Sequence, residues 1–458
     1  MKIDASLLQK YNKPGPRYTS YPPANLFSAD IDSVQYRNQI VASDKSDPQN
    51  ISVYLHVPFC TQLCHFCGCN TQLFEAGDST AKYFAALHRE ISGAAELISP
   101  DRKLTQIHWG GGTPNAVPMS YIAGVMQLLR ELFTFADNAE IAMECNPAYL
   151  SEEQVVAIGQ MGFNRISIGI QDFDTAVLKT INRQPSLLPI NQLLLLLRNN
   201  GIQGINLDFV YGLPGQTVES FCDSINRAID LQPERLVTFS YAHVPWVKSA
   251  QKILERAHLP TAEEKLSMLE ASCKLLVQRG YAAIGIDHYA LPTDELALAE
   301  SAKTLHRNFQ GYCTLGKTGQ VYAFGSSAIS QLAGGYFQNH KSSTDYVRAI
   351  NESGFAVERG YLLTDTDKLV RDIINQIMCN HYVNLESLAE MHGIGLADLL
   401  KTCHFDQSAM DELQADGLAI FDGKTIEVLP AGYYFTRNLA MLFDPQLTAG
   451  QNVYSKTI

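Results

Sequence analysis

The chain has 458 residues, 46% of them hydrophobic and 18% charged, which is enough for a large core and a smaller second domain. Its formal net charge of −12 and pI of about 5.5 argue against nucleic acid or an anionic membrane as the main partner. The longest block of leucines, 193–197, is far too short to span a membrane, and the first residues lack the apolar run of a signal peptide. We therefore expect a cytoplasmic monomer whose ten cysteines are reduced thiols or metal ligands.

The first predicted segment is an N-terminal arm, residues 1–45. It contains Pro14, Pro16, Pro22 and Pro23. Proline fixes φ and removes a backbone donor, which disfavours regular structure. We expect an irregular arm that packs on the rest of the protein.

The second segment, residues 46–360, alternates short runs rich in β-branched residues with longer stretches of helical period. Six repeats of a βα unit predict an α/β fold, a parallel sheet curled into a partial (β/α)6 TIM-like barrel. The expected strands are 51–57, 105–109, 140–145, 165–170, 205–210 and 236–241, and the expected helices are 79–98, 118–134, 151–161, 187–199, 217–231 and 261–279.

Polar or glycine-rich features lie near the end of five of these strands or directly after it. In parallel α/β folds the chemistry lies on the loops after the carboxyl ends of the strands. We therefore expect one rim to collect all five features. In chain order they are the cysteine-rich stretch 59–70, the sequence GGGTP at 110–114, Glu144, Gln171 and Asp208.

The third segment, residues 361–458, changes character to short helical stretches followed by a small hairpin that turns at Asp422 and Gly423. This pattern predicts a small, mainly helical, winged-helix-like domain. Its many carboxylates argue against DNA binding, so we expect a lid or a docking module.

The stretch FCTQLCHFCGCN places four cysteines in ten residues, with the spacing C-x3-C-x2-C-x-C. Zinc sites usually use two separated C-x2-C knuckles or a knuckle with a histidine pair, and no second knuckle follows here. Thiolates on one short loop suit an iron–sulfur cluster. A zinc-binding structural module remains the simplest alternative, but it would leave GGGTP, Glu144 and Gln171 unexplained.

The C-x3-C-x2-C part, with Phe66 before the third cysteine, resembles the signature of the radical S-adenosylmethionine superfamily. The resemblance implies that Cys60, Cys64 and Cys67 hold three irons of one [4Fe–4S] cluster. The fourth iron then binds S-adenosylmethionine, and Cys69 is not a ligand.

Further motifs are similar to those of the oxygen-independent coproporphyrinogen III oxidase family. They are GPRYTSYPP (15–23), HWGGGTP (108–114), IQDFD (170–174), DFVYGLPGQT (208–217), GIDHYALPTDELA (285–297) and LHRNFQGY (305–312). The resemblance spans the chain from about residue 10 to the C-terminal segment. One departure is Asn146 in ECNP, where the family pattern leads us to expect an acidic residue.

This resemblance implies an enzyme of haem biosynthesis that works without oxygen. It implies oxidative decarboxylation of two propionates of coproporphyrinogen III to vinyl groups, giving protoporphyrinogen IX by a 5′-deoxyadenosyl radical mechanism. It also implies two S-adenosylmethionine molecules, and reduced flavodoxin or ferredoxin as the electron donor.

The resemblance further implies residue roles. Contacts to the S-adenosylmethionine on the cluster would come from Tyr54, Gly111, Glu144 and Ile329. Contacts to the second molecule would come from Phe66, Gly112, Thr113, Gln171, Arg183, Asp208 and Ala242. Cys69 and Tyr54 are candidate catalytic residues, although Cys69 could also be a packed thiol.

The substrate carries four carboxylates, so cations must gather locally in this acidic chain. Arg17 and Arg307 are the candidates, against the alternative that each arginine is structural.

Two other functions remain open on the same fold. A haem chaperone would bind haem without decarboxylation, but such relatives typically have an aromatic residue at the position of Cys69 and lack the PRYTSYP arm. A radical methyltransferase that opens haem is the second. Asp287, His288 and His306 are further candidates for the substrate side.

Overall fold

The computed structural model describes residues 5–285 and 287–447. The ends of the predicted arm and of the predicted C-terminal segment, 1–4 and 448–458, therefore lie outside the described residues. Within the described part, no helix has both the length and the apolar character needed to cross a membrane.

The centre of the fold is a twelve-stranded sheet in the order β16-β15-β14-β13-β1-β4-β5-β6-β7-β8-β10-β9. The strands from β13 to β8 in this order run parallel. These parallel strands are β13 (Gln320–Phe324), β1 (Ile51–Val57), β4 (Lys103–Gly111), β5 (Thr134–Cys145), β6 (Arg165–Gln171), β7 (Gly204–Tyr211) and β8 (Arg235–Ser240).

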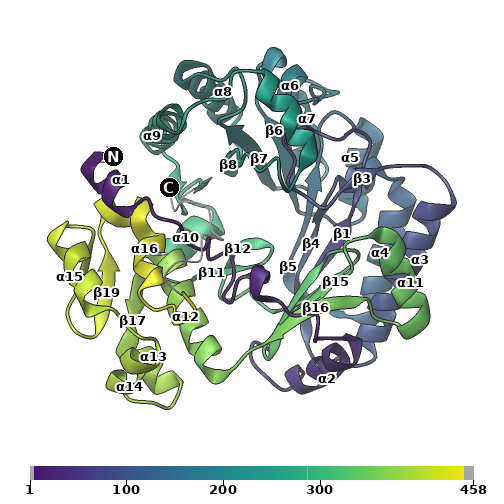
Figure 1. Ribbon diagram of the computed structural model, residues 1–458. Coiled ribbons are helices and arrows are strands. Elements are labelled where there is room, and N and C mark those ends of the chain that lie inside the picture. The colour runs from purple at the N-terminus through teal and green to yellow at the C-terminus, as the bar shows by residue number, and fades with distance from the viewer. Residues whose placement is uncertain (1–4, 286, 448–458) are drawn as a thin grey trace.

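Helices cover the outer face of the curved sheet (Figure 1). Several begin with the caps that their sequences favour: the Ser151 hydroxyl accepts from the Gln154 amide, and Thr217 and Thr261 form capping boxes. The covering helices are α3 (Asp78–Ala95), α4 (Met119–Leu132), α5 (Glu152–Gln160), α6 (Thr175–Thr180), α7 (Ile190–Asn199), α8 (Val218–Asp230) and α9 (Ala262–Gln278).

Antiparallel strands extend the sheet at both edges, and the two edge strands do not pair, so the barrel stays open. The fold class predicted from the sequence, a partial barrel built from βα units, is confirmed, and each of the six expected strands is present. The additional strands are β9 (Ala282–Ala283), β10 (His288–Ala290), β14 (Ile329–Leu332), β15 (Gly335–Asn339) and β16 (Val357–Leu362).

The C-terminal region is helical with a small sheet, as predicted. Its strands pair in the order β17-β19-β18, and the β18–β19 hairpin turns at Asp422 and Gly423. Its elements are α12 (Asp365–Asn380), β17 (Tyr382–Asn384), α13 (Leu385–Met391), α14 (Leu396–Thr402), α15 (Gln407–Ala415), β18 (Ala419–Phe421), β19 (Thr425–Val428), η4 (Pro430–Phe435) and α16 (Thr436–Met441).

The N-terminal arm packs on this C-terminal region. Tyr11, Tyr18 and Tyr21 are buried in the hydrophobic core of the C-terminal helices, and Figure 1 shows α1 (Ala5–Tyr11) beside α16. Together the arm and the C-terminal elements lie beside the open side of the barrel (Figure 1). The arm is less irregular than predicted, because α1, a turn of 3-10 helix η1 (Ala24–Leu26) and α2 (Ser33–Ser43) lie in it.

The remaining elements connect these parts. They are β2 (Phe59–Cys60), β3 (Gln72–Leu73), η2 (Pro114–Ala116), η3 (Ser249–Arg256), α10 (Glu295–Ser301), β11 (Leu305–Asn308), β12 (Gly311–Thr314) and α11 (Ser343–Ser353).

Candidate active site

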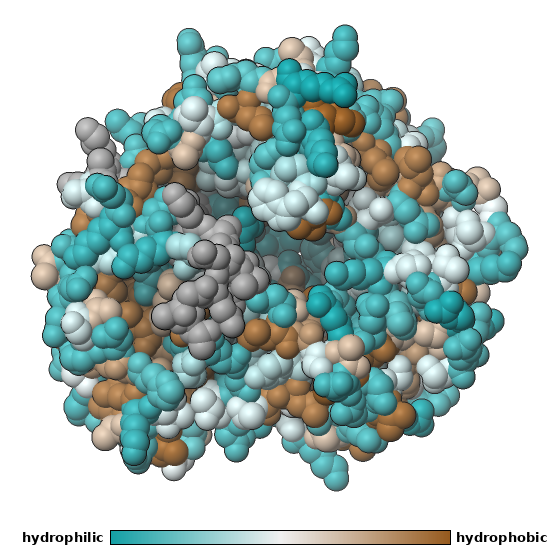
Figure 2. Space-filling model, viewed as in Figure 1, coloured by the Kyte–Doolittle hydropathy of each residue, from teal (hydrophilic) through white to brown (hydrophobic). Residues whose placement is uncertain are grey.

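A cavity of about 570 Å³ lies inside the barrel and includes residues at the carboxyl ends of the parallel strands. Figure 2 shows the molecule hollowed near the middle of the face in view. The five features that the sequence predicted for one rim all reach this cavity. The candidate residues that line it are Cys60, Cys64, Phe66, Cys67, Cys69, Gly111, Gly112, Thr113, Glu144, Gln171, Arg183, Asp208 and Ala242.

The cysteine loop leaves the sheet directly after β1. Its two ends, β2 and β3, pair in parallel and close the loop at its base. The His65 amide donates to the Ile181 carbonyl at 3.0 Å, and the Gln62 side chain donates to the Asn182 side chain at 2.7 Å. The loop is therefore held against the end of α6 as well as against β1.

The four thiols have different surroundings. Cys60 is buried with its Sγ 3.4 Å from the Thr113 hydroxyl, and burial raises its pKa to about 11. The Arg183 guanidinium lies 3.6 Å from Cys64 Sγ. Cys67 Sγ accepts from the Cys69 amide at 3.4 Å, and hydrogen bonds from the Cys69 side chain and backbone lower the pKa of Cys67 to about 6. Cys67 is thus the thiol most readily ionised, and the thiolate is the form that binds metal.

The glycine turn at 110–112 lies directly against this loop. The amide of Gly112 donates to the Val57 carbonyl at 2.7 Å. A Cβ at Gly112 would meet the backbone of Pro58 and Phe59 at 2.8 Å, and Gly111 adopts a φ of +109°, which other residues rarely adopt. Only glycine therefore allows the turn to approach the cysteine loop this closely.

Glu144, at the end of β5, connects the glycine turn to the strands. Its carboxylate accepts from the Gly111 amide at 3.3 Å and lies 3.0 Å from His108 Nε2. Burial opposes ionisation, but the hydrogen bond and charge of His108 outweigh it and lower the pKa of Glu144. Tyr54 stacks on the His108 ring with centroids 5.9 Å apart, and its hydroxyl lies 3.2 Å from His56 Nδ1. An ionised carboxylate thus faces the cavity beside the cysteine loop.

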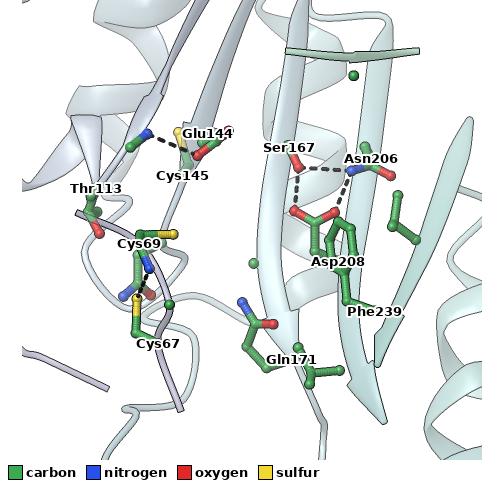
Figure 3. Close-up of a pocket in the computed structure, with 18 of the residues that line it drawn as sticks. Cys67, Cys69, Thr113, Glu144, Cys145, Ser167, Gln171, Asn206, Asp208 and Phe239 are labelled. Carbon is green, nitrogen blue, oxygen red and sulfur yellow. Dashed lines mark hydrogen bonds between the residues drawn. The ribbon is translucent and has the colours of Figure 1, made fainter. Parts of the chain in front are cut away.

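The opposite wall of the cavity carries Asp208 and Gln171 (Figure 3). The Asp208 carboxylate accepts from the Ser167 hydroxyl and, at 2.7 Å, from the Asn206 side chain. Burial nevertheless raises the pKa of Asp208 to about 6. Gln171 adopts a φ of +68° at the end of β6, an uncommon conformation for a residue other than glycine. The two walls of the cavity therefore offer a carboxylate each.

Some predicted site residues do not line the cavity. Tyr54 reaches it only through His108, and Ile329 packs with Phe27 and Tyr336. Arg307 is half-buried, with its guanidinium 4.8 Å above the Tyr312 ring. That tyrosine does line the cavity.

Arg17 is exposed in the arm, next to Tyr18. Burial, with a smaller contribution from the charge of Arg17, lowers the pKa of Arg437 of α16 to about 10. Arg437 Nε is buried without a hydrogen-bond partner. Two cations from distant parts of the sequence therefore lie near each other beside the barrel.

The chain matches known proteins over nearly its whole length. Residues 54–228 match the Radical SAM superfamily. The oxygen-independent coproporphyrinogen III oxidase of Synechocystis sp. is 37% identical over 100% of this chain and 98% of its own length. The chain belongs to this oxidase family.

Further comparisons agree. The oxygen-independent coproporphyrinogen III oxidase of Escherichia coli is 40% identical over 97% of this chain and 95% of its own length. The solved structure of coproporphyrinogen III oxidase from Escherichia coli, described as a radical SAM enzyme, superposes with a TM-score of 0.90 at 37% identity. That match covers 98% of this chain and 100% of the solved one.

The superfamily implies a [4Fe–4S] cluster and S-adenosylmethionine, and the site of this coproporphyrinogen III oxidase family member fits both. Four thiols lie on one loop, and the adjacent turn leaves no room for a Cβ. Among the described residues no three Cys, His, Asp or Glu side chains are already grouped as a metal site.

Several residues that shape this site were given no role on the basis of the sequence. His108 orients Glu144, Ser167 and Asn206 hold Asp208, and Arg437 adds a cation near Arg17. His108 lies in the HWGGGTP motif, so the sequence could have indicated it as a site residue. Arg437 lies in no quoted motif, and only the fold brings it to Arg17.

Proposed function

We propose that this protein catalyses the oxygen-independent oxidative decarboxylation of coproporphyrinogen III to protoporphyrinogen IX. The observation that carries the proposal is the single cavity in which the cysteine loop and Glu144 face Asp208 and Gln171. Full-length similarity to enzymes named for this substrate supports it.

In this proposal Cys60, Cys64 and Cys67 hold the cluster and Cys69 does not. Their sequence spacing and their place on one closed loop support the assignment. Cys69 is solvent-accessible and hydrogen-bonded to Cys67. That position suits a thiol that acts near the cluster, so we assign Cys69 a catalytic role.

We place the cluster-bound S-adenosylmethionine on the Glu144 side of the cavity. Glu144 is an acceptor for its ammonium group, and the Gly111 turn allows close backbone approach. Tyr54 stacks on His108 and acts through it. Ile329 is assigned to contacts with the same S-adenosylmethionine. A bound and reduced cluster would supply the electron that cleaves the sulfonium of S-adenosylmethionine, and the hydrogen abstraction that follows would let the propionate lose carbon dioxide and pass one electron to an acceptor, leaving a vinyl group.

We place a second S-adenosylmethionine on the opposite wall. Asp208 and Gln171 offer acceptors for ribose hydroxyls, and Arg183 offers a cation for a carboxylate. The remaining contacts are assigned to Phe66, Gly112, Thr113 and Ala242. Two separate polar walls in one cavity support a site that holds two cofactor molecules.

We assign substrate carboxylates to the cations near the barrel mouth. Arg17 and Arg437 lie together, and Arg437 Nε has no protein partner. A guanidinium with a buried, unpaired Nε favours a bound carboxylate. Arg307 is the third candidate, and its aromatic contact with Tyr312 links it to the cavity wall.

We divide the chain into an arm (1–45), a catalytic domain (46–360) and a C-terminal domain (361–458). The burial of arm tyrosines in the C-terminal core supports a shared role for the two outer segments. That role is to close the open side of the barrel over the substrate.

The experiment is anaerobic incubation of the reconstituted protein with coproporphyrinogen III, S-adenosylmethionine and dithionite, followed by chromatography. Protoporphyrinogen IX and 5′-deoxyadenosine should appear together. A protein with an intact cluster that binds haem tightly and never forms protoporphyrinogen would contradict the proposal and favour the haem chaperone.

A further inference from the structure

The outer face of the cysteine loop is bordered by an unusual surface segment, residues 244–258. Trp246 is 78% exposed and Val247 67% exposed, and Ile253 is 44% exposed beside them in sequence. Lys252 and Arg256 are exposed on η3 of the same segment. We name these five residues the Trp246 patch.

The segment is attached to the cysteine loop itself. Lys248 Nζ donates to the Cys69 carbonyl at 2.7 Å, and Gln251 Nε2 donates to the Phe66 carbonyl at 3.0 Å. Leu254 on the inner side of η3 packs in one hydrophobic cluster with Phe66. The inner side of η3 thus contacts the loop, and its outer residues face solvent.

The charge of this surface is opposite to that of the chain. Residues 59–73 contain no Asp, Glu, Lys or Arg, and residues 244–258 contain three cations, Lys248, Lys252 and Arg256, against one carboxylate, Glu255. Glu255 lies 3.3 Å from His243. The protein as a whole carries 47 acidic and 35 basic residues. The surface segment beside the loop is therefore cationic although the chain as a whole is acidic.

An exposed tryptophan among aliphatic residues with cations at the border is typical of a protein-binding surface. Tryptophan is enriched among the residues that dominate binding energy, and surface charges steer a partner of opposite sign. The inner side of the loop faces the cavity that the cofactors and substrate fill. Among the described residues, the outer side of the loop is the side on which exposed residues border it.

We propose that the Trp246 patch docks an acidic one-electron carrier protein that reduces the cluster through the cysteine loop. The inference rests on the proposed function, because the cluster must receive an electron before it can cleave S-adenosylmethionine. The carrier passes one electron to the oxidised cluster and leaves oxidised by one electron.

The test compares a protein donor with a small chemical reductant. The variants are Lys252→Glu/Arg256→Glu and Trp246→Ala, each reduced either by an acidic flavodoxin or by dithionite. The matched control, Lys45→Glu/Lys103→Glu, makes the same charge change on exposed lysines near the amino ends of β1 and β4. The readouts are the rate at which the visible absorption of the cluster bleaches and the turnover of coproporphyrinogen III.

We expect the double variant to reduce the flavodoxin-dependent bleaching rate at low salt by about tenfold and to weaken its dependence on ionic strength. Rates with dithionite should match the wild type in every variant, and the control should behave as the wild type with both donors. An unchanged flavodoxin rate in both patch variants, or an equal loss in the control, would overturn the docking site. If the wild-type protein did not turn over coproporphyrinogen III with dithionite, the proposed function would be contradicted instead. The rate of cluster bleaching by flavodoxin would still test the Trp246 patch in that case.

Discussion

The four cysteines of the loop give the sharpest test at the residue scale. Changing Cys60, Cys64 or Cys67 to Ser removes one thiolate ligand, so iron content and the visible absorption of the cluster should be lost after anaerobic reconstitution. Cys69→Ala should keep a full complement of iron and lose decarboxylation. Cys69→Ala without iron, together with a full cluster in Cys60→Ser, would reverse the assignment.

The raised pKa of Asp208 leads us to expect that S-adenosylmethionine binding at the second cofactor site depends on pH. Burial, with a smaller contribution from Glu144, raises its pKa to about 6, against the Ser167 and Asn206 hydrogen bonds and the charge of His288. Since the ionised form is the better acceptor for ribose hydroxyls, S-adenosylmethionine occupancy should fall as the pH drops through about 6. The same shift makes the folded state hold a proton that the unfolded chain has released between about pH 4 and pH 6, so Asp208 lowers stability as pH rises across that window.

Equilibrium dialysis of labelled S-adenosylmethionine between about pH 5 and pH 8 measures this effect. Asp208→Asn should bind more weakly at high pH and lose the pH-dependent step near pH 6. A step of unchanged size and midpoint in Asp208→Asn would assign the titration to another group.

Single residues also show how far the sequence reaches into the site. Glu144 was predicted at the correct edge because the carboxyl ends of parallel strands meet there. Its partner His108 was in a quoted motif, but a hydrogen bond between adjacent strands depends on register, which the sequence alone does not specify. Arg17 could be predicted only as a cation of the arm, because its neighbour Arg437 is 420 positions away in the sequence.

At the scale of elements, Glu90 of α3 ties the helix to the far side of the sheet. Its buried carboxylate accepts from the Gly325 amide at 2.9 Å, the Tyr346 hydroxyl at 2.7 Å and the Asn339 side chain at 2.6 Å. Glu90→Ala leaves these donors without their acceptor and should lower the free energy of unfolding by about 3 kcal/mol. Glu90→Gln keeps one acceptor and should lose less, as measured by urea unfolding. Equal stabilities of Glu90→Ala and the wild type would show that other acceptors replace the carboxylate.

The arm and the C-terminal region are joined at Asp444, which accepts from the Tyr18 hydroxyl at 2.9 Å and the Tyr21 hydroxyl at 3.0 Å. Asp444→Ala removes the acceptor that both tyrosines share, at a cost of about 1 kcal/mol, or about fivefold in local opening. Limited trypsin digestion should therefore cut after Arg17 about fivefold faster. Asp422→Ala, in the β18–β19 turn, loses the same charge without touching the arm and should be cut as the wild type is. Equal cutting of both variants would argue that the arm is held mainly by apolar burial.

The helices and strands of the barrel were well predicted because their apolar runs and helical periods are clear, and helices such as α5, α8 and α9 also begin with a side-chain cap. The expected range 51–57 matches β1, and the predicted cap at Ser151 is made. The antiparallel strands β14 to β16 were not predicted. They are only four to six residues long and differ in pattern, because β14 alternates, β15 is buried throughout and β16 is irregular, so no single period separates them from loops.

At the scale of the whole molecule, the fold brings positive charges from distant parts of the sequence to the barrel. The chain is acidic, yet Arg17 and Arg437, from opposite ends of the sequence, lie near each other beside the barrel. Changing both to Ala should raise the KM for coproporphyrinogen III, because two partners for its carboxylates are lost, and should leave the iron content unchanged. Steady-state assays and iron analysis measure the two effects. An unchanged KM would assign these arginines to the structure of the arm.

The central claim is that this barrel directs a 5′-deoxyadenosyl radical to the β-carbon of a propionate. The most direct measurement is anaerobic turnover of coproporphyrinogen III deuterated at the propionate β-carbons, followed by mass spectrometry of the nucleoside product. The account predicts deuterium in 5′-deoxyadenosine together with protoporphyrinogen IX. Protoporphyrinogen IX formed with unlabelled 5′-deoxyadenosine, or labelled substrate recovered intact from a protein with a reduced cluster, would contradict it.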